Sequence, residues 1–263
     1  KTVVNLFFEP STRTKTSFEL AAKRLSADVL SFDVSTSSIS KGETITDTAK
    51  NIEAMKVDCF IVRHSISGAP QIIGQSVSSS VINAGDGCHE HPTQALLDLF
   101  TVREKMGKIE GINIAIIGDV LHSRVARSNI WGFTKMGANV CVCGPPTIVP
   151  REIEKMGAEI TYSIDEALQD ADIVYLLRLQ RERQKENYLT SLKEYSIYYG
   201  IDEERYKRII KKGAFIMHPG PMNRGLEIKS DIADRDGSLI LEQVTNGIAV
   251  RMAVLYLTIG VKK

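Results

Sequence analysis

The feature that most constrains the fold is a regular alternation of short apolar runs with helical patterns along the 263 residues. In the first part of the chain, apolar runs predict strands at 3–8, 27–32, 57–64 and 79–85. Helical patterns at 14–25 and 44–55 lie between these runs, and a third, at 91–105, follows the last of them. Such alternation favours parallel sheets that are covered by helices.

A second series of the same kind follows the helix predicted at 91–105. Its predicted strands are 112–120, 138–144, 159–162, 172–177 and 214–221, and its predicted helices are 123–137, 150–157 and 163–171. An apolar helical pattern at 245–261 ends the chain. The two series predict an α/β fold of two domains, each a parallel sheet flanked by helices, with the active site in the cleft between them.

We place the domain boundary after the helix at 91–105. One domain is expected at 1–105 and the other at 106–241, and the C-terminal helix, 242–263, is expected to pack back on the first domain. The chain opens with Lys inside an apolar run, so we also expect an N-terminal element to precede it.

The charge balance limits the partners of the chain. Its 33 basic and 32 acidic residues give a formal net charge of +1, which predicts no general attraction to nucleic acid or to acidic membranes. No apolar run approaches the roughly 18–20 residues that span a bilayer. Any anion site must therefore arise from local groups.

The four cysteines indicate a cytosolic protein rather than a disulfide framework. Cys88 opens a Cys-His-Glu-His run, but the run lacks the spacing that brings ligands onto one face of a helix. We therefore predict no metal.

Polar clusters follow the predicted strands, where ligands bind in open α/β sheets. The first, Ser11-Thr12-Arg13-Thr14, begins a predicted helix. Free N–H groups, the helix dipole, hydroxyls and a guanidinium there suit a phosphate group. The alternative is simple helix capping, which would explain Ser11 alone but not the whole cluster.

Three further side chains of the first series are candidates for the same ligand. Arg63 ends an apolar strand and offers a second cation, although an arginine in such a place is usually solvated. His91 stands at a helix start, where the dipole favours the neutral imidazole, and Gln94 follows one turn later. Lys41-Gly42 lies in a polar segment that suits either a closing loop or an ordinary surface loop.

The second series carries a different set of candidates. Gly118 and its neighbours lack the other glycines of a dinucleotide-binding turn, so NAD and ATP are disfavoured, and no cofactor is predicted. Arg124 on the next helix is suited to a carboxylate, and Arg178 and Gln180 share one side if their strand continues. The 218–221 turn, His-Pro-Gly-Pro, either presents backbone carbonyls to a ligand or is a plain turn.

These residues together resemble the aspartate/ornithine carbamoyltransferase family across essentially the whole chain. The resemblance rests on FFEPSTRTKTSFE, SKGET, HPTQALLD, LRLQRER and HPGP, which follow one another in this order along the chain. SKGET and HPGP are similar to the aspartate branch, since the ornithine branch carries a Cys where Pro219 stands.

The resemblance implies that the carbamoyl group of carbamoyl phosphate is transferred to the amino group of L-aspartate in pyrimidine biosynthesis, without a cofactor. It implies that 1–105 binds carbamoyl phosphate and 106–241 binds aspartate. The implied carbamoyl phosphate ligands are Ser11, Thr12, Arg13, Thr14, Ser37, Lys41, Arg63, His91, Gln94, Gly220 and Pro221. The implied aspartate ligands are Lys41, Arg124, Arg178 and Gln180, and the implied catalytic residues are Arg13, Lys41, Arg63 and His91.

The resemblance also implies a cytoplasmic homotrimer in which Ser37 and Lys41 reach a neighbouring subunit's site. Glu9 and Arg183 match the ion-pair residues that close the domains in the family. Whether regulatory chains or dihydroorotase associate with the trimer stays open. The alternative functions are transfer to ornithine or another amino acid, and a non-catalytic phosphate- or carboxylate-binding protein.

Overall fold

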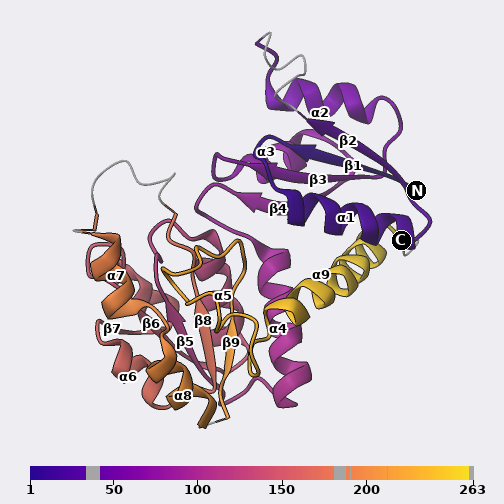
Figure 1. Ribbon diagram of the computed structural model, residues 1–263. Helices are drawn as coiled ribbons and strands as arrows, with labels where there is room; N and C mark the ends of the chain where they lie inside the picture. The colour runs from indigo at the N-terminus through magenta and orange to yellow at the C-terminus, as the bar shows by residue number, and fades with distance from the viewer. Residues whose placement is uncertain (34–41, 181–187, 190, 212, 261–263) are drawn as a thin grey trace. The chain divides into compact units, whose positions relative to one another are not determined.

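The structure is a computed structural model that describes residues 1–33, 42–180, 188–189, 191–211 and 213–260. It divides into two compact units, of which unit 1 comprises 1–93 with 245–263 and unit 2 comprises 94–244. The two units divide near the start of the helix Pro92–Met106, whereas the predicted domain boundary, after residue 105, lies near the end of that helix. The predicted boundary stays a prediction. Figure 1 shows the elements of each unit.

Unit 1 is built on four parallel strands in the order β2-β1-β3-β4. The strands are β1 Thr2–Phe7, β2 Asp28–Asp33, β3 Cys59–His64 and β4 Ser80–Asp86. The helices are α1 Thr12–Arg24, α2 Ile45–Glu53 and α3 Ala69–Ser76, and α4, Pro92–Met106, begins at the end of the unit.

Alternate residues along the strands of unit 1 enter two separate cores, as a strand period of two requires. Val3 and Ile61 pack with Phe18 of α1 and with Leu255 of α9, Ile240–Leu255. Val4, which points to the opposite face, packs instead with residues of α2 and α3. Helices therefore cover both faces of the sheet (Figure 1).

Unit 2 contains five parallel strands in the order β7-β6-β5-β8-β9. The strands are β5 Asn113–Ile117, β6 Asn139–Cys143, β7 Glu159–Thr161, β8 Ile173–Leu176 and β9 Phe215–Met217. The helices are α5 Arg124–Lys135, α6 Ile164–Gln169, α7 Leu192–Tyr199 and α8 Glu203–Lys211. Residues of α4 and α5 form one core with the sheet, and residues of α6 and α8 form another.

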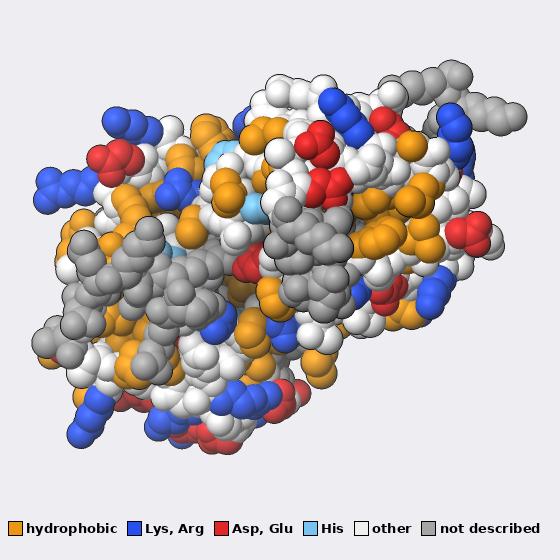
Figure 2. All heavy atoms as spheres, turned by 90° about the horizontal axis from the view of Figure 1, so that it is seen from above, with side chains coloured by type: hydrophobic (Ala, Val, Ile, Leu, Met, Phe, Trp, Pro, Cys, Tyr) orange, Lys and Arg blue, Asp and Glu red, His pale blue; other side chains and the backbone are white. Residues whose placement is uncertain are grey.

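These sheets confirm the predicted fold class of parallel sheets flanked by helices. Both charge signs are interspersed over the face in Figure 2, in keeping with the net charge of +1. Within the described residues, none of the helices combines the length and the apolar character needed to cross a membrane.

Several element predictions were incomplete or wrong. The helices α3, α7 and α8 were not predicted; α3 contains Pro70 and Gly74, and burial of its Ile73 outweighs their low helix propensity. The segment predicted as a helix at 150–157 is a 3-10 helix, Arg151–Met156. The strand predicted at 214–221 ends at Met217, and α9 begins at Ile240, before its predicted start.

The packing of α1 on its sheet generates a stability prediction. Phe18 is fully buried, and the Arg251 guanidinium carbon lies 5.2 Å from the centroid of its ring. Phe18→Ala should lower the free energy of unfolding by about 3–5 kcal/mol, because it removes a buried ring and leaves a cavity. Urea-induced unfolding followed by circular dichroism measures this change.

The matched control is Lys23→Ala on the same helix, whose exposed side chain should contribute within about 0.5 kcal/mol. Equal unfolding midpoints for the two variants would contradict the packing of α1 described above.

Candidate active site

In unit 1, the predicted phosphate cluster follows β1, one of the two central strands of the sheet. The order in which strands are added to the sheet reverses between β1 and β3. β1 is paired with β2 on one side and with β3 on the other, and Phe7 of β1 is in register with Arg63 of β3. The Phe8 N–H donates to the Arg63 carbonyl at 2.8 Å. Ligands bind at such switch points because the loops after the two strands diverge there.

The start of α1 has the form expected of an anion site. Ser11 is the N-cap residue in an extended conformation, and within the described residues its side chain makes no capping hydrogen bond. The first turn contains no acidic residue. Thr12 and Arg13 are exposed, whereas Thr14 is buried. The capping interpretation therefore leaves the Ser11 hydroxyl unexplained, and the N–H groups of this turn suit an anion.

Arg63 lies near the carboxyl end of β3, a central strand of the same sheet. Its Nη1 lies 3.4 Å from the Ala84 carbonyl oxygen, and its Nε lies 3.7 Å from Oε2 of Glu9. Its side chain is only 12% exposed. The structure thus pairs Glu9 with Arg63. Arg183, which the resemblance implies is an ion-pair residue like Glu9, lies outside the described residues, as do Ser37 and Lys41.

The loop before His91 is ordered by the buried carboxylate of Asp86. Asp86 accepts from the N–H groups of Glu90 at 2.8 Å and Gly68 at 2.9 Å, and His89 Nδ1 lies 3.2 Å from it. A side chain at Gly87, whose φ is +52°, would come within 2.7 Å of a backbone nitrogen. These contacts fix the chain just before His91, which is 5% exposed.

Gln94 stands on the first turn of α4 and is 8% exposed. Its Nε2 donates to Oδ1 of Asp98, one turn further along the helix, at 3.0 Å. Its amide is therefore held by a buried carboxylate.

In unit 2, the predicted carboxylate ligands follow a second switch point. β5 is paired with β6 and with β8, and Ile117 of β5 is in register with Leu176 of β8. Arg124 begins α5 and is 3% exposed, and the Ser123 hydroxyl caps this helix by accepting from the Ala126 N–H. The loop after β5 and the loop after β8 thus leave from the same edge of the sheet.

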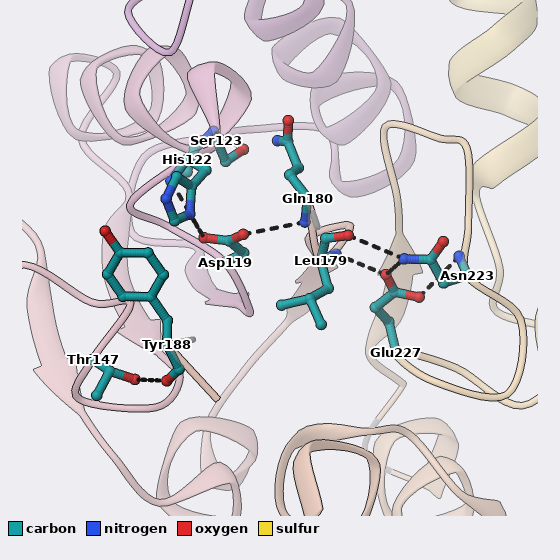
Figure 3. Close-up of polar contacts among 10 residues, drawn as sticks. Asp119, His122, Ser123, Thr147, Leu179, Gln180, Tyr188, Asn223 and Glu227 are labelled. Carbon is teal, nitrogen blue, oxygen red and sulfur yellow. Dashed lines mark hydrogen bonds and ion pairs between the residues drawn. The ribbon is translucent and has the colours of Figure 1, made fainter. Parts of the chain in front are cut away.

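β8 ends at Leu176, so the strand does not continue through Arg178 and Gln180 as the prediction assumed. Two buried carboxylates hold this segment instead (Figure 3). Asp119 accepts from the Gln180 N–H at 3.1 Å, and Glu227 accepts from the Leu179 N–H at 2.8 Å. Arg178 and Gln180 are half-buried.

Each of these carboxylates is fixed by further partners. His122 Nδ1 lies 2.8 Å from Asp119, and its ring packs edge-on against that of Tyr188. Asn223 donates to Glu227 through its backbone and its side chain, at 2.9 and 2.8 Å. Burial raises the pKa of Glu227, although its hydrogen bonds oppose this effect.

The 218–221 turn is anchored through its first residue. The His218 N–H donates to Oε1 of Gln243 at 2.9 Å, and the Gly220 N–H donates to His218 Nδ1 at 2.8 Å. The Gly220–Pro221 peptide bond is cis. Pro221 is exposed, and Gly220 is half-buried.

Sequence reasoning therefore missed the acidic and amide residues that support the candidate ligands. These residues are Asp86, Asp98, Asp119, Asn223, Glu227 and Gln243. Of these, Asp86 and Asp119 carried a signal, because each directly follows the Gly that ends an apolar run.

No candidate metal cluster of three or more His, Cys, Asp or Glu residues occurs in the described part of the chain. The described residues include all four cysteines, and none of them forms a disulfide; Cys59 and Cys143 are buried.

Comparison with known protein families agrees with this arrangement. Residues 1–104 match the carbamoyl-P binding domain of aspartate/ornithine carbamoyltransferase, and residues 110–258 match the Asp/Orn binding domain.

Relatives with curated names are similar over nearly all of the chain. The aspartate carbamoyltransferase catalytic subunit of Halothermothrix orenii is 58% identical over 260 residues, which are 99% of this chain and 83% of the relative. The catalytic subunit of Endomicrobium trichonymphae is 59% identical over 98% of this chain and 82% of its own length.

Solved structures share the fold. Aspartate transcarbamoylase from Trypanosoma cruzi, in complex with carbamoyl phosphate and aspartate, has a TM-score of 0.87 at 32% identity, covering 97% of this chain and 84% of that one. The catalytic subunit of M. jannaschii aspartate transcarbamoylase has a TM-score of 0.85 at 34% identity, covering 99% and 85%. The chain described here belongs to the aspartate/ornithine carbamoyltransferase family.

Proposed function

We propose that this protein transfers the carbamoyl group of carbamoyl phosphate to the amino group of L-aspartate, forming N-carbamoyl-L-aspartate and phosphate in pyrimidine biosynthesis. The observation that carries the proposal is the 58% identity, over 99% of the chain, to an aspartate carbamoyltransferase catalytic subunit. The anion-suited start of α1 and the arginines near the second switch point support the same substrates.

The phosphate group is assigned to unit 1. Ser11, Thr12, Arg13 and Thr14 would bind it through N–H groups, hydroxyls and a guanidinium, and Arg63 lies near the end of the neighbouring strand, β3. Arg63 already lies 3.7 Å from Glu9, a distance at which a phosphate oxygen can replace the carboxylate. A dianion gains more than a carboxylate from the same cations.

The carbamoyl group is assigned to His91, Gln94 and the Gly220-Pro221 backbone. Negative charge develops on the carbonyl oxygen during attack, and preorganised donors from His91, Arg13 and Arg63 would stabilise it. The amino group of the carbamoyl would donate to Gln94 and to a backbone carbonyl of the turn.

The two carboxylates of aspartate are assigned to Arg124, Arg178 and Gln180, with Lys41. Buried Arg124 and the clamped 178–180 segment offer fixed cations and donors, as carboxylate recognition requires. The amine then attacks the carbonyl carbon, the C–O bond to phosphate breaks, and a phosphate oxygen takes the proton that the amine loses. Alignment of the two substrates would supply much of the acceleration.

We further propose a cytoplasmic homotrimer in which Ser37 and Lys41 act in a neighbouring subunit's site. This proposal rests on the family resemblance.

The first prediction concerns the reaction itself. Protein incubated with labelled carbamoyl phosphate and L-aspartate should release labelled N-carbamoyl-L-aspartate, identified by chromatography, with one phosphate per product. L-ornithine should give no product, because Arg124 and Arg178 would repel its side-chain ammonium. Arg13→Ala should lower turnover by about 100-fold or more, since it removes a donor to the developing charge.

Carbamoylated ornithine would contradict the assignment of aspartate. Absence of turnover with either amine would favour a non-catalytic binding protein.

A second prediction concerns the clamp on the 178–180 segment. In Glu227→Gln, an amide NH2 replaces one acceptor oxygen and faces the backbone N–H of either Leu179 or Asn223, which then loses its acceptor. The KM for aspartate should rise by about tenfold, whereas the Kd for carbamoyl phosphate should stay within about twofold. Steady-state kinetics and equilibrium binding measure the two constants.

The control variant, Glu152→Gln, neutralises an exposed glutamate of the same unit and should leave both constants unchanged. Loss of carbamoyl phosphate binding in Glu227→Gln would instead indicate general disruption.

A third prediction tests shared sites. Lys41→Ala and Arg13→Ala should each be inactive alone, but mixed subunits should regain activity, because some sites would combine an intact Arg13 with an intact Lys41 from a neighbour. Activity is measured after subunit exchange, which a mass-tagged partner confirms. Exchange without any recovery of activity would rule out the shared site.

A further inference from the structure

Unit 2 contains a buried carboxylate that receives hydrogen bonds from four different elements. Asp98 of α4 is fully buried, and the groups that donate hydrogen bonds to its carboxylate are three side-chain amides and one phenol hydroxyl. Its Oδ1 accepts from Nε2 of Gln94 at 3.0 Å and from Nε2 of Gln243 at 2.7 Å. Its Oδ2 accepts from Nδ2 of Asn129 at 2.9 Å and from the Tyr175 hydroxyl at 2.7 Å.

An ionised carboxylate only accepts hydrogen bonds, so each amide in contact with it must turn its NH2 toward it. Gln94 therefore presents its other atom, Oε1, away from Asp98. Gln243 likewise turns its Oε1 away, and there it accepts from the His218 N–H at 2.9 Å. One carboxylate thus sets the orientation of two side-chain amides.

The second amide connects Asp98 to the 218–221 turn. His218 accepts at Nδ1 from the Gly220 N–H, so a continuous chain of hydrogen bonds runs from Asp98 through Gln243 and His218 to Gly220. Both groups that the proposed function assigns to the carbamoyl NH2, Gln94 and the Gly220-Pro221 backbone, are therefore tied to the same buried group.

We propose that Asp98, acting with Gln243, is a positioning residue that aims hydrogen-bond acceptors at the carbamoyl NH2 and so makes the protein selective for carbamoyl phosphate over acyl phosphates. This inference rests on the proposed function, because it takes carbamoyl phosphate as the substrate. An acetyl group has a methyl in place of the NH2 and leaves these acceptors without a donor, which a preorganised polar site penalises.

The protonation state of Asp98 agrees with this role. Burial raises the pKa of Asp98 to about 6, against the effect of its four donors. At pH 8 the carboxylate form therefore prevails, and the donors around it hold a single arrangement.

The test compares the affinities of carbamoyl phosphate, acetyl phosphate and inorganic phosphate for the full chain at pH 8, without aspartate, by calorimetry. Wild-type protein should bind carbamoyl phosphate more tightly than acetyl phosphate. In Asp98→Asn, an NH2 replaces one acceptor and favours reversed amides, so this selectivity should fall by about tenfold. The Kd for inorganic phosphate, which has no carbamoyl group, should stay within about twofold.

The matched control is Tyr175→Phe. It removes a donor from Oδ2 of the same carboxylate but leaves the Oδ1 contacts with Gln94 and Gln243 in place. Its selectivity should stay within about twofold of wild type. An equal loss of selectivity in Tyr175→Phe would show that any damage to this core has the same effect, and it would overturn the positioning role.

A double variant tests whether Asp98 acts through Gln94. Gln94→Ala and Asp98→Asn together should lose much less selectivity than the product of the two single losses, because the second change removes support for a side chain that is already absent. A fully multiplicative loss would overturn the proposed route.

Two outcomes distinguish failure of this inference from failure of the proposed function. Wild-type protein without turnover of carbamoyl phosphate and aspartate would overturn the proposed function and this inference with it. Turnover by wild type, with wild-type selectivity in folded Asp98→Asn, would overturn the positioning role alone. If Asp98→Asn does not fold, Gln243→Leu takes its place, and unchanged selectivity in that variant likewise overturns the proposal.

Discussion

Both candidate ligand clusters depend on the hydrogen-bonded pairing of two parallel strands at a point where strand order reverses. In unit 1 this pairing sets Phe7 beside Arg63, and in unit 2 it sets Ile117 beside Leu176. The loops that follow the paired strands leave from the same edge, so residues far apart in sequence share that edge. The hydrophobic pattern that builds the sheets thereby also determines which polar residues are close enough to act on one ligand.

The loops at these edges are held mainly by buried carboxylates that accept from backbone N–H groups. Asp86 orders the segment before His91, and Asp119 and Glu227 hold the segment around Arg178. Burial of a carboxylate is costly, as the raised pKa of Glu227 indicates. A buried carboxylate reduces stability unless its oxygens receive hydrogen bonds. Here the hydrogen bonds that offset the cost of burial also hold the loops in one defined conformation.

The sequence predicted the sheets and the polar loops after them because strand periodicity and helix starts are local patterns. The N-cap position of Ser11 and the helix start at Arg124 follow from such patterns. The support of the site could not be predicted in this way. Asp98 reads as an ordinary polar residue of a helix, yet its partners Tyr175 and Gln243 lie 77 and 145 residues away. Partners so distant are selected by the packing of helices on the sheet, which no local pattern encodes.

Recognition of a substrate with charged ends and a neutral centre divides into two physical tasks. Cations at the ends supply affinity, but a phosphate oxygen attracts Arg13 equally well in carbamoyl phosphate, acetyl phosphate and inorganic phosphate. Only the neutral centre distinguishes these molecules, and it does so through the direction of hydrogen bonds rather than through charge. An amide such as Gln94 can present either a donor or an acceptor, so it discriminates only if one orientation is enforced. Enforcement requires a group that accepts and never donates, which explains why a carboxylate, despite its cost of burial, occupies position 98.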